Sequence, residues 1–471
     1  MSRDSRTIHF VSLGCPKNRV DSEVMLGVAH EEGYSQVPDA SAAEVIVVNT
    51  CGFIDAAKEE SIQTILELAQ NKRAGRCQKL VVTGCLSQRY SQDLAEGLPE
   101  VDHLLGSSDM LGIAQVLRGH AERMLVGNPA GWVVRAEDPR VVSTPGASAY
   151  LKLAEGCNRS CAFCVIPSLR GKQRSREPED ILREAQGLVA SGVKELNLVS
   201  QDTIAYGRDL PTAPKLAQVV ENLAEHSGAH WVRLFYLYPE RLDPALVELL
   251  AQHPRVLPYV DMPLQHAADS MLRRMRRGHG GPRLREVIER LRREIPDLVL
   301  RSAFIVGHPG ESEAEFQELC DFVEWAQIDR LGVFRYSDEE DAPSHQLADK
   351  VAPGVAAARV EELMSLQQPI SLRKNEALLG RRLSVLVEGP SEESELVMQG
   401  RHRGQAPEID GCVYLSGESV EPGQLVCAEI MEAQEYDLLG EVLSIEEAAT
   451  TPATQALLHL SQDGRRVLRT V

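Results

Sequence analysis

Three cysteines near the middle of the chain have the spacing of an iron-sulfur ligand set. Residues 155–164 read EGCNRSCAFC, so Cys157, Cys161 and Cys164 follow a Cys-x3-Cys-x2-Cys pattern directly after an apolar stretch. Three thiolates on one loop can hold three irons of a 4Fe-4S cluster and leave the fourth iron open. A molecule with an amine beside a carboxylate can chelate that iron, as the methionine end of S-adenosylmethionine does. The triplet therefore predicts one-electron chemistry on S-adenosylmethionine.

A zinc knuckle is the alternative for a short loop rich in cysteine. Structural zinc sites take four ligands, and no fourth cysteine or histidine lies within ten residues of this triplet. The iron-sulfur interpretation is therefore favoured over zinc.

Three further cysteines lie far apart in sequence but share one structural position. Cys15, Cys51 and Cys85 each come just after an apolar stretch, in the segments LGC, NTC and TGC. If these stretches are neighbouring parallel strands, their carboxyl ends meet at one edge of a sheet, where doubly wound folds bind ligands. We expect the three thiols to converge there and to hold a second 4Fe-4S cluster with one open iron. The alternative is that each is an ordinary buried thiol, as a lone cysteine after a strand usually is.

The central triplet also carries a family resemblance. With Phe163 immediately before the last cysteine, residues 148–340 resemble the radical S-adenosylmethionine superfamily. The resemblance implies that one electron from the cluster cleaves S-adenosylmethionine and releases a deoxyadenosyl radical.

Two short motifs agree with a nucleoside site in the same segment. Gln201 and Asp202 end one predicted strand, where they could hydrogen-bond ribose or substrate. Gly307, Gly310 and Glu311 follow another strand, and the resemblance places this stretch near the adenosyl group. Glycines there could let the backbone approach the ligand closely. A role in forming the loop alone is the open alternative for both motifs, and no catalytic residue beyond the cluster ligands is assigned.

The first ligand-bearing domain is predicted in residues 1–125. Apolar stretches at 9–13, 45–48 and 80–83 alternate with helical segments, which is typical of a small doubly wound α/β domain. Residues 126–147, rich in Gly, Pro, Ser and Val, are predicted to be a linker.

The second ligand-bearing domain is predicted in residues 148–375. Six β/α units fit an open or partial (β/α)6 barrel of the TIM type, with chemistry at the carboxyl ends of the strands. The strands are expected at 150–153, 196–199, 232–235, 259–261, 299–304 and 332–334.

Beyond these domains, the pattern changes to short strands separated by Gly-rich turns. Residues 378–442 are predicted to form a small antiparallel β-barrel. Residues 443–471 are expected to be a poorly ordered tail.

Composition limits the class of protein and its partners. The 471 residues are 43% hydrophobic and 25% charged, and 50 basic against 69 acidic residues give a net charge of −19. No apolar run approaches the roughly 20 residues of a membrane span, so a cytosolic location is expected.

In the cytosol thiols stay reduced, so ten cysteines favour metal binding or catalysis over disulfides. Four of the ten fit no pattern and are expected to be ordinary thiols: Cys77, Cys320, Cys412 and Cys427.

Two open-iron clusters on one chain resemble the methylthiotransferase family. That family orders its domains as this chain does, with an N-terminal cluster domain, a radical barrel and a C-terminal barrel called TRAM, and the resemblance covers residues 8–442. The segment 12–23, SLGCPKNRVDSE, resembles the branch that modifies a ribosomal protein, whereas the transfer-RNA branch usually has Gln-Met after that cysteine. The segments 265–267 and 405–411 favour the same branch.

The resemblance implies a reaction, cofactors and partners. One S-adenosylmethionine methylates a sulfur on the N-terminal cluster, and a second is cleaved at the barrel cluster. The radical takes hydrogen from the β-carbon of an aspartate in small-subunit ribosomal protein twelve, and methylthio transfer gives 3-methylthioaspartate. A low-potential flavodoxin or ferredoxin supplies the electrons.

Other functions stay open at this point. They are methylthiolation of a transfer-RNA adenosine, a non-catalytic iron-sulfur carrier, and an RNA-binding module. Residues 381–440 contain four Arg, no Lys and twelve Asp or Glu, a net charge of −8. That charge suits a basic protein better than a phosphate backbone, although a solvated acidic face is the plain alternative.

Overall fold

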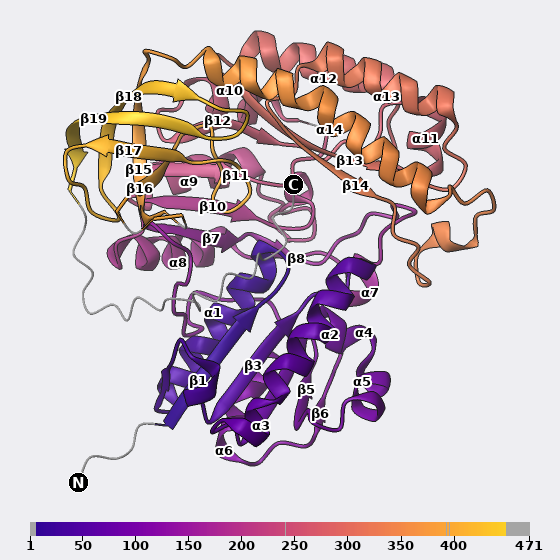
Figure 1. The fold of residues 1–471 in the computed structure, drawn as a ribbon, viewed down its shortest axis with the longest axis vertical. Helices are drawn as coiled ribbons and strands as arrows, with labels where there is room; N and C mark the ends of the chain where they lie inside the picture. The colour runs from indigo at the N-terminus through magenta and orange to yellow at the C-terminus, as the bar shows by residue number, and fades with distance from the viewer. Residues whose placement is uncertain (1–5, 241, 392, 395, 449–471) are drawn as a thin grey trace.

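The computed structural model describes residues 6–448 except 241, 392 and 395. Figure 1 shows an N-terminal α/β domain, a larger central α/β domain above it, and a C-terminal β-barrel beside the central domain. The predicted fold class is confirmed. None of the helices in these described ranges is both long and apolar enough to cross a lipid bilayer.

The N-terminal sheet is parallel throughout and has the strand order β2-β1-β3-β4-β5-β6. Its central strands are runs of branched apolar residues that are buried on both faces. The strands are β1 (Arg6–Ser12), β2 (Tyr34–Gln36), β3 (Val45–Thr50), β4 (Lys79–Gly84), β5 (His103–Leu105) and β6 (Met124–Leu125). The helices are α1 (Pro16–Glu31), α2 (Asp55–Ala69), α3 (Asn71–Ala74), α4 (Cys85–Arg89), α5 (Ser91–Gly97) and α6 (Ile113–Arg118).

The order of the N-terminal strands reverses between β1 and β3. In an open parallel sheet the carboxyl ends of the strands at such a reversal flank the ligand crevice. Because β1, β3 and β4 are neighbours, the residues that follow them lie along this one edge. Figure 1 shows that the edge faces the central domain.

The central domain has six parallel strands in the order β14-β13-β12-β11-β10-β7, which leaves the sheet open. The strands are β7 (Ser148–Lys152), β10 (Glu195–Val199), β11 (Trp231–Leu234), β12 (Val256–Asp261), β13 (Val299–Val306) and β14 (Arg330–Arg335). The long helices are α8 (Pro178–Ala190), α9 (Leu216–His226), α10 (Pro244–Gln252), α12 (Gly281–Glu294), α13 (Glu313–Ala326) and α14 (Pro353–Glu376). Smaller elements are β8 (Ala154–Glu155), α7 (Ile166–Arg170), β9 (Arg174–Ser175) and α11 (Asp269–Arg274).

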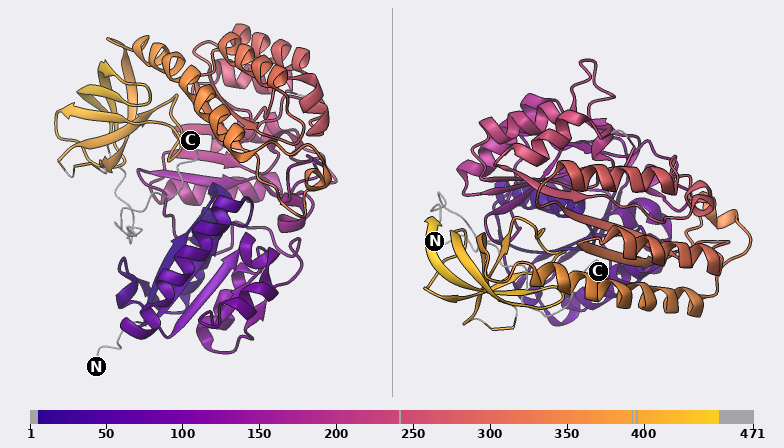
Figure 2. Two further views of the ribbon diagram at one scale, coloured as in Figure 1. Left: turned by 45° about the vertical axis from the view of Figure 1, so that its right-hand side comes forward. Right: turned by 90° about the horizontal axis from the view of Figure 1, so that it is seen from above.

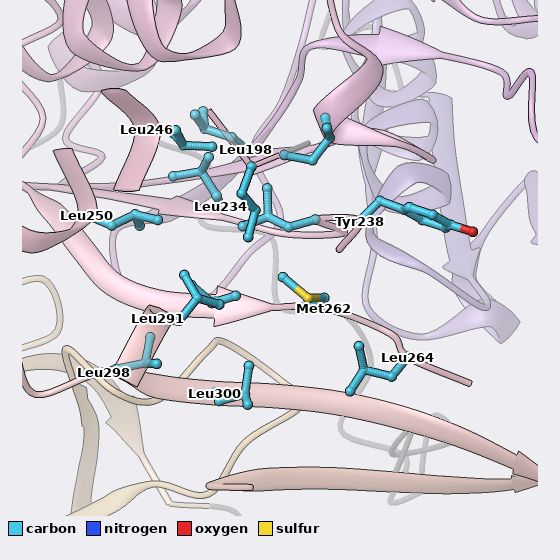
Figure 3. Packing of buried hydrophobic residues seen from close by; sticks show 14 of the residues in the cluster. Leu198, Leu234, Tyr238, Leu246, Leu250, Met262, Leu264, Leu291, Leu298 and Leu300 are labelled. Carbon is cyan, nitrogen blue, oxygen red and sulfur yellow. The ribbon is translucent and has the colours of Figure 1, made fainter. Parts of the chain in front are cut away.

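The core of the central domain lies between this sheet and its helices. In Figure 3, leucines of α10 and α12 lie close to leucines of β10, β11 and β13. Each fully buried leucine contributes about 1.5–3 kcal/mol by leaving water. This packing makes the sheet a rigid platform for the loops that carry chemistry.

The C-terminal barrel is closed and has the strand order β15-β16-β17-β19-β18. Its strands are β15 (Arg382–Pro390), β16 (Met398–His402), β17 (Val413–Gly417), β18 (Leu425–Ala433) and β19 (Leu438–Glu447). The expected antiparallel pairing needs one correction, because β17 and β19 pair in parallel. An odd number of strands cannot alternate in direction around a closed ring, so a five-stranded barrel must contain a parallel pair.

The strand β19 ends at Glu447, beyond the predicted end of the barrel at residue 442. The predicted tail therefore begins with residues that belong to a strand. Residues 449–471 of that tail lie outside the described residues.

The barrel is anchored on the open sheet by buried charges and by the loop after β16. Arg401 and Arg233 both pair with Glu195, whose side chain is fully buried on β10. Tyr259 donates a hydrogen bond to Asp410 Oδ2 over 2.8 Å, and Tyr150 donates one to the carbonyl oxygen of Pro407 over 3.3 Å. The segment 405–411 therefore closes against the sheet, as the barrel does in both views of Figure 2.

Candidate active site

The central cysteine triplet lies on the loop between β8 and α7, and each of its sulfurs accepts a hydrogen bond. The backbone N–H of Arg159 lies 3.4 Å from Cys157 Sγ, and that of Ile166 lies 3.5 Å from Cys164 Sγ. The guanidinium Nη1 of Arg277 lies 3.3 Å from Cys161 Sγ. Donors aimed at all three sulfurs stabilise thiolates over thiols.

Burial has the opposite effect on two of these thiols. It raises the pKa of Cys157 to about 11 and that of Cys164 to about 12. Without a bound cation they are therefore protonated near neutral pH, and a metal group must displace the protons when it binds.

The arrangement of donors distinguishes a cluster from a single ion. In the described part of the chain, no three His, Cys, Asp or Glu side chains are gathered tightly enough to hold one metal ion. An iron-sulfur cubane takes each thiolate at a separate corner, so the three thiols of one loop fit it without converging on a point. The donor set suits a 4Fe-4S cluster better than zinc.

Two predicted contact residues beside the triplet have buried oxygens without partners. Gln201 donates to Glu155 Oε1 over 2.5 Å, and Asp202 accepts from Arg159 over 2.6 Å. The remaining oxygens, Gln201 Oε1 and Asp202 Oδ1, are buried and make no hydrogen bond. Since buried polar groups are normally paired, these two acceptors fit a ligand that carries N–H or O–H donors.

The other predicted motif is occupied by the protein itself. Arg359 donates to Glu311 Oε2 over 2.9 Å, and the other carboxylate oxygen lies 3.1 Å from His266 Nε2. A Cβ at Gly307 would lie 2.6 Å from Ala356 Cβ, and one at Gly310 would overlap Arg274. These contacts support the loop-forming alternative for the motif, and its role near an adenosyl group stays a prediction.

The structure brings the three N-terminal cysteines together at the carboxyl edge of the sheet. Cys15 precedes α1, Cys51 follows β3, and Cys85 begins α4. Asn18 joins two of these loops, because its Nδ2 donates to the carbonyl oxygens of Leu13 and Thr50 over 3.1 and 3.0 Å.

The three thiols are close enough to affect one another electrostatically. Burial, with added repulsion from Cys85 and Cys15, raises the pKa of Cys51 to about 12. Gly14 lets the loops approach, since a Cβ there would lie only 2.8 Å from Cys51 Cβ.

One buried arginine connects this triad with the central triplet. Arg170, on α7, places Nε 3.3 Å from Cys85 Sγ and Nη1 2.7 Å from Asp21 Oδ2. Lys152 pairs with the same Asp21 over 2.5 Å and with Glu155 over 2.6 Å. Glu155 stands two residues before Cys157, so one continuous ion network extends from one cysteine set to the other.

A buried lysine lies beside the N-terminal triad. The ammonium of Lys17 is 3.3 Å from the centre of the Tyr236 ring, and the side chain is 8% exposed. Burial acts to lower the pKa of Lys17, but Tyr236 and Cys15 outweigh it, so the pKa is raised from its ordinary value.

Sequence reasoning did not assign a role to the basic residues of this site. Arg159, Arg170, Arg277 and Lys17 all lie near a cysteine of one of the two sets. Two of them could have been suspected, since Lys17 and Arg159 are each two residues from such a cysteine. Arg170 and Arg277 reach their sulfurs from distant segments, which spacing does not reveal.

Comparison with known proteins adds to this geometry. Sequence profiles match the Uncharacterized protein family UPF0004 at residues 7–106, the Radical SAM superfamily at 151–323 and the TRAM domain at 379–443. A protein of Sorangium cellulosum named Ribosomal protein uS12 methylthiotransferase RimO is 61% identical, covering 98% of this chain and 99% of its own. Relatives of the same name are 50% identical in Anaeromyxobacter sp. strain K, covering 98% and 99%, and 46% identical in Geobacter sulfurreducens, covering 94% and 100%.

The chain belongs to the RimO family of methylthiotransferases. This RimO-family chain is thus a radical S-adenosylmethionine enzyme that transfers a sulfur group, as predicted. Membership implies a 4Fe-4S cluster and S-adenosylmethionine as cofactors.

A solved structure with the same fold supports the arrangement of the RimO-family chain. The radical S-adenosylmethionine methyltransferase TsrM from Kitasatospora setae is 12% identical, with a TM-score of 0.53 over 78% of this chain and 89% of its own. At this identity the likeness concerns the fold alone.

Proposed function

We propose that this enzyme adds a methylthio group to the β-carbon of an aspartate in ribosomal protein uS12, small-subunit ribosomal protein twelve, and so forms 3-methylthioaspartate. Three findings support the proposal: the relatives of that name, two cysteine triads on facing domains, and the ion network between the triads. The observation that carries it is Arg170, which lies 3.3 Å from Cys85 Sγ and 3.5 Å from Glu155, two residues before Cys157.

Each triad has its own part in the proposal. Cys157, Cys161 and Cys164 would hold the cluster that reduces S-adenosylmethionine, and Cys15, Cys51 and Cys85 would hold a second 4Fe-4S cluster that carries the sulfur. When bound, these groups supply the electron transfer and the sulfur chemistry. A low-potential flavodoxin or ferredoxin would deliver the electrons.

The protein's own residues bind, orient and exclude water. Arg159 holds Asp202 and Glu240 beside the central triplet, over 2.6 and 2.9 Å. Gln201 and Asp202 each present a buried acceptor to the nucleoside. The network of Arg170, Lys152 and their carboxylates fixes the distance between the two triads, which is the positioning that a transfer between them requires.

The charge of the barrel favours a protein substrate over transfer RNA. Of its four arginines in residues 381–440, Arg401 is buried on Glu195 and unable to contact a phosphate. An acidic surface suits a basic ribosomal protein, and RNA binding should not dominate recognition.

The decisive experiment reconstitutes the enzyme anaerobically with iron and sulfide and reduces it in the presence of S-adenosylmethionine. Both candidate substrates, ribosomal protein uS12 and transfer RNA, are offered, and mass spectrometry detects a methylthio gain. A gain on the ribosomal protein alone is expected. A gain on transfer RNA would overturn the proposed substrate, and deoxyadenosine without any gain would leave only the radical-enzyme assignment.

Variants assign the two triads. Cys15→Ala and Cys157→Ala should each abolish the methylthio gain, and only Cys157→Ala should also abolish S-adenosylmethionine cleavage. Cys427→Ser is the matched control, because this partly exposed thiol of the barrel belongs to neither triad. An inactive Cys427→Ser would mean that thiol loss in general disturbs the enzyme.

A further inference from the structure

Lys17 differs from the other buried cations at the interface between the N-terminal and central domains. Lys152, Arg170 and Arg140 each pair with two carboxylates. Within residues 6–448, apart from the three undescribed positions, no carboxylate lies within ion-pair distance of the Lys17 ammonium. Its close neighbour is the face of the Tyr236 ring, 3.3 Å away.

A buried ammonium normally pairs with an anion. The Tyr236 ring, Cys15 and, at longer range, Glu155 favour the charge of Lys17. Among the described residues none of these groups forms an ion pair with the ammonium, so the site can still accept an anion.

Both sides of this site are held in place. Lys17 lies in the first turn of α1, two residues after Cys15. Tyr236, which follows β11, has a φ of +58°, an unfavourable backbone conformation for a tyrosine. Its N–H donates to Asp261 Oδ2 over 3.0 Å, and its carbonyl accepts from the N–H of Thr203 over 3.2 Å. The ammonium is therefore fixed between the N-terminal triad and the carboxyl ends of the central strands.

We propose that the Lys17 ammonium binds the side-chain carboxylate of the substrate aspartate. The proposal rests on the proposed function, in which the β-carbon of that aspartate accepts the methylthio group. The carboxylate is one bond from the β-carbon, so anchoring it leaves the reacting carbon little freedom. Because Lys17 is two residues from Cys15, the anchored carbon would lie near the sulfur that the N-terminal triad holds.

A competing role must be separated from this one. Lys17 could instead offset only the negative charge of thiolates and cluster at the N-terminal triad. In that case its removal would weaken the cluster and disturb every bound peptide alike, whatever the charge of the peptide's target side chain. If Lys17 recognises the substrate, its removal should weaken binding only of the peptide whose target side chain is a carboxylate.

The test is a double-mutant cycle of binding, with no turnover. Fluorescence anisotropy measures the affinity of the reconstituted, unreduced enzyme for a labelled peptide spanning the uS12 loop with its target aspartate. A second peptide carries asparagine at that position. Wild-type enzyme should prefer the aspartate peptide about tenfold or more. Lys17→Met should lower the affinity for the aspartate peptide about 10- to 100-fold, as loss of a charged hydrogen bond does, and change the asparagine peptide less than about twofold.

Each other outcome overturns the proposal in a recognisable way. If wild-type enzyme binds the aspartate and asparagine peptides with equal affinity, the proposal is wrong, and no variant is needed to show it. Equal losses for both peptides in Lys17→Met would assign Lys17 to the cluster or the fold. If wild-type enzyme binds neither peptide, the proposed function fails as well. Lys17→Arg, which keeps the charge, should restore the preference for aspartate, and Lys17→Gln replaces Lys17→Met if that variant does not fold.

Discussion

The guanidinium of Arg170 lies 3.3 Å from the sulfur of Cys85, although the two residues belong to different domains. Arg170 follows the central triplet on α7, and Cys85 begins α4 of the N-terminal domain. The hydrogen bond makes the environment of one cysteine set depend on the loop that carries the other.

Replacing Arg170 should therefore alter the cluster that we propose at the N-terminal triad. Arg170→Gln removes a buried charge from Asp21 and should lower the free energy of unfolding by about 3–5 kcal/mol. Loss of the positive donor should also lower the reduction potential of the N-terminal cluster. A redox titration that is monitored by electron paramagnetic resonance measures that potential. Both enzymes carry Cys157→Ala in this experiment. Arg183→Gln, at an exposed arginine of the central domain, is the control, and an unchanged potential in Arg170→Gln would contradict the assignment.

Glu195 should hold the barrel on the central sheet. Although burial acts to raise it, Arg401 and Arg233 lower the pKa of Glu195 to about 2, so the side chain is charged. Glu195→Gln would leave the buried Arg233 without its counter-charge and Arg401 with Glu388 alone, and should cost about 3–5 kcal/mol. Hydrogen exchange should rise in β15 and β16. Glu441→Gln, on the exposed side of β19, should leave exchange unchanged, and protection retained in Glu195→Gln would refute the anchoring role.

Gly14 should be required for the cluster that we propose at the N-terminal triad. Its φ is +86°, and an added Cβ would lie 2.8 Å from Cys51 Cβ. Gly14→Ala should therefore separate the cysteine loops and leave roughly half of the iron, that of the central cluster. Gly119→Ala is the matched control, since Gly119 has a φ of +79° in the same domain and open space around its Cα. Iron per chain is measured after reconstitution, and equal iron in the two variants would contradict the requirement for Gly14.

The buried His402 should make the folded protein less stable in weak acid. Burial lowers its pKa to about 3, whereas an unfolded chain protonates near pH 6.5. As the pH falls from 6.5 toward 3, His402 takes up a proton in the unfolded state but not in the folded state. The free energy of unfolding therefore falls by up to about 1.4 kcal/mol per pH unit. His402→Asn keeps an acceptor for the N–H of Gly404 and should make the loss shallower.

Urea unfolding at pH 7.5, 6 and 5 measures that slope. The exposed His120→Asn serves as the control, and it should unfold with the wild-type dependence on pH. A slope in His402→Asn as steep as in the wild-type protein would remove His402 as the cause.

The sequence was most informative where one local pattern determined the structure. The spacing of Cys157, Cys161 and Cys164 needs only one loop, and the apolar run before Cys51 makes a buried strand in any parallel sheet. The convergence of Cys15, Cys51 and Cys85 followed from the rule that parallel strands end at one edge.

Other features depend on contacts that no local pattern encodes. Arg170 meets Cys85 across 85 positions of sequence, and its orientation depends on how two domains dock. The end of β19 was missed because residues 443–447 are exposed, so the strand lacks the apolar alternation that marks a half-buried one. The pairing of Glu311 with Arg359, 48 residues away, likewise has no local signal, and the predicted ligand contact of Glu311 stays a prediction.

The anchoring of the barrel has a consequence for how the chain is made. Glu195 leaves the ribosome 206 residues before Arg401, its partner. Since domains fold in order during synthesis, Glu195 of the nascent central sheet is paired with Arg233 alone, and this buried pair lacks the cover of the barrel until the barrel emerges. Truncated chains that end before residue 401 should therefore depend on chaperones, and the last domain to be translated completes the folding of the one before it.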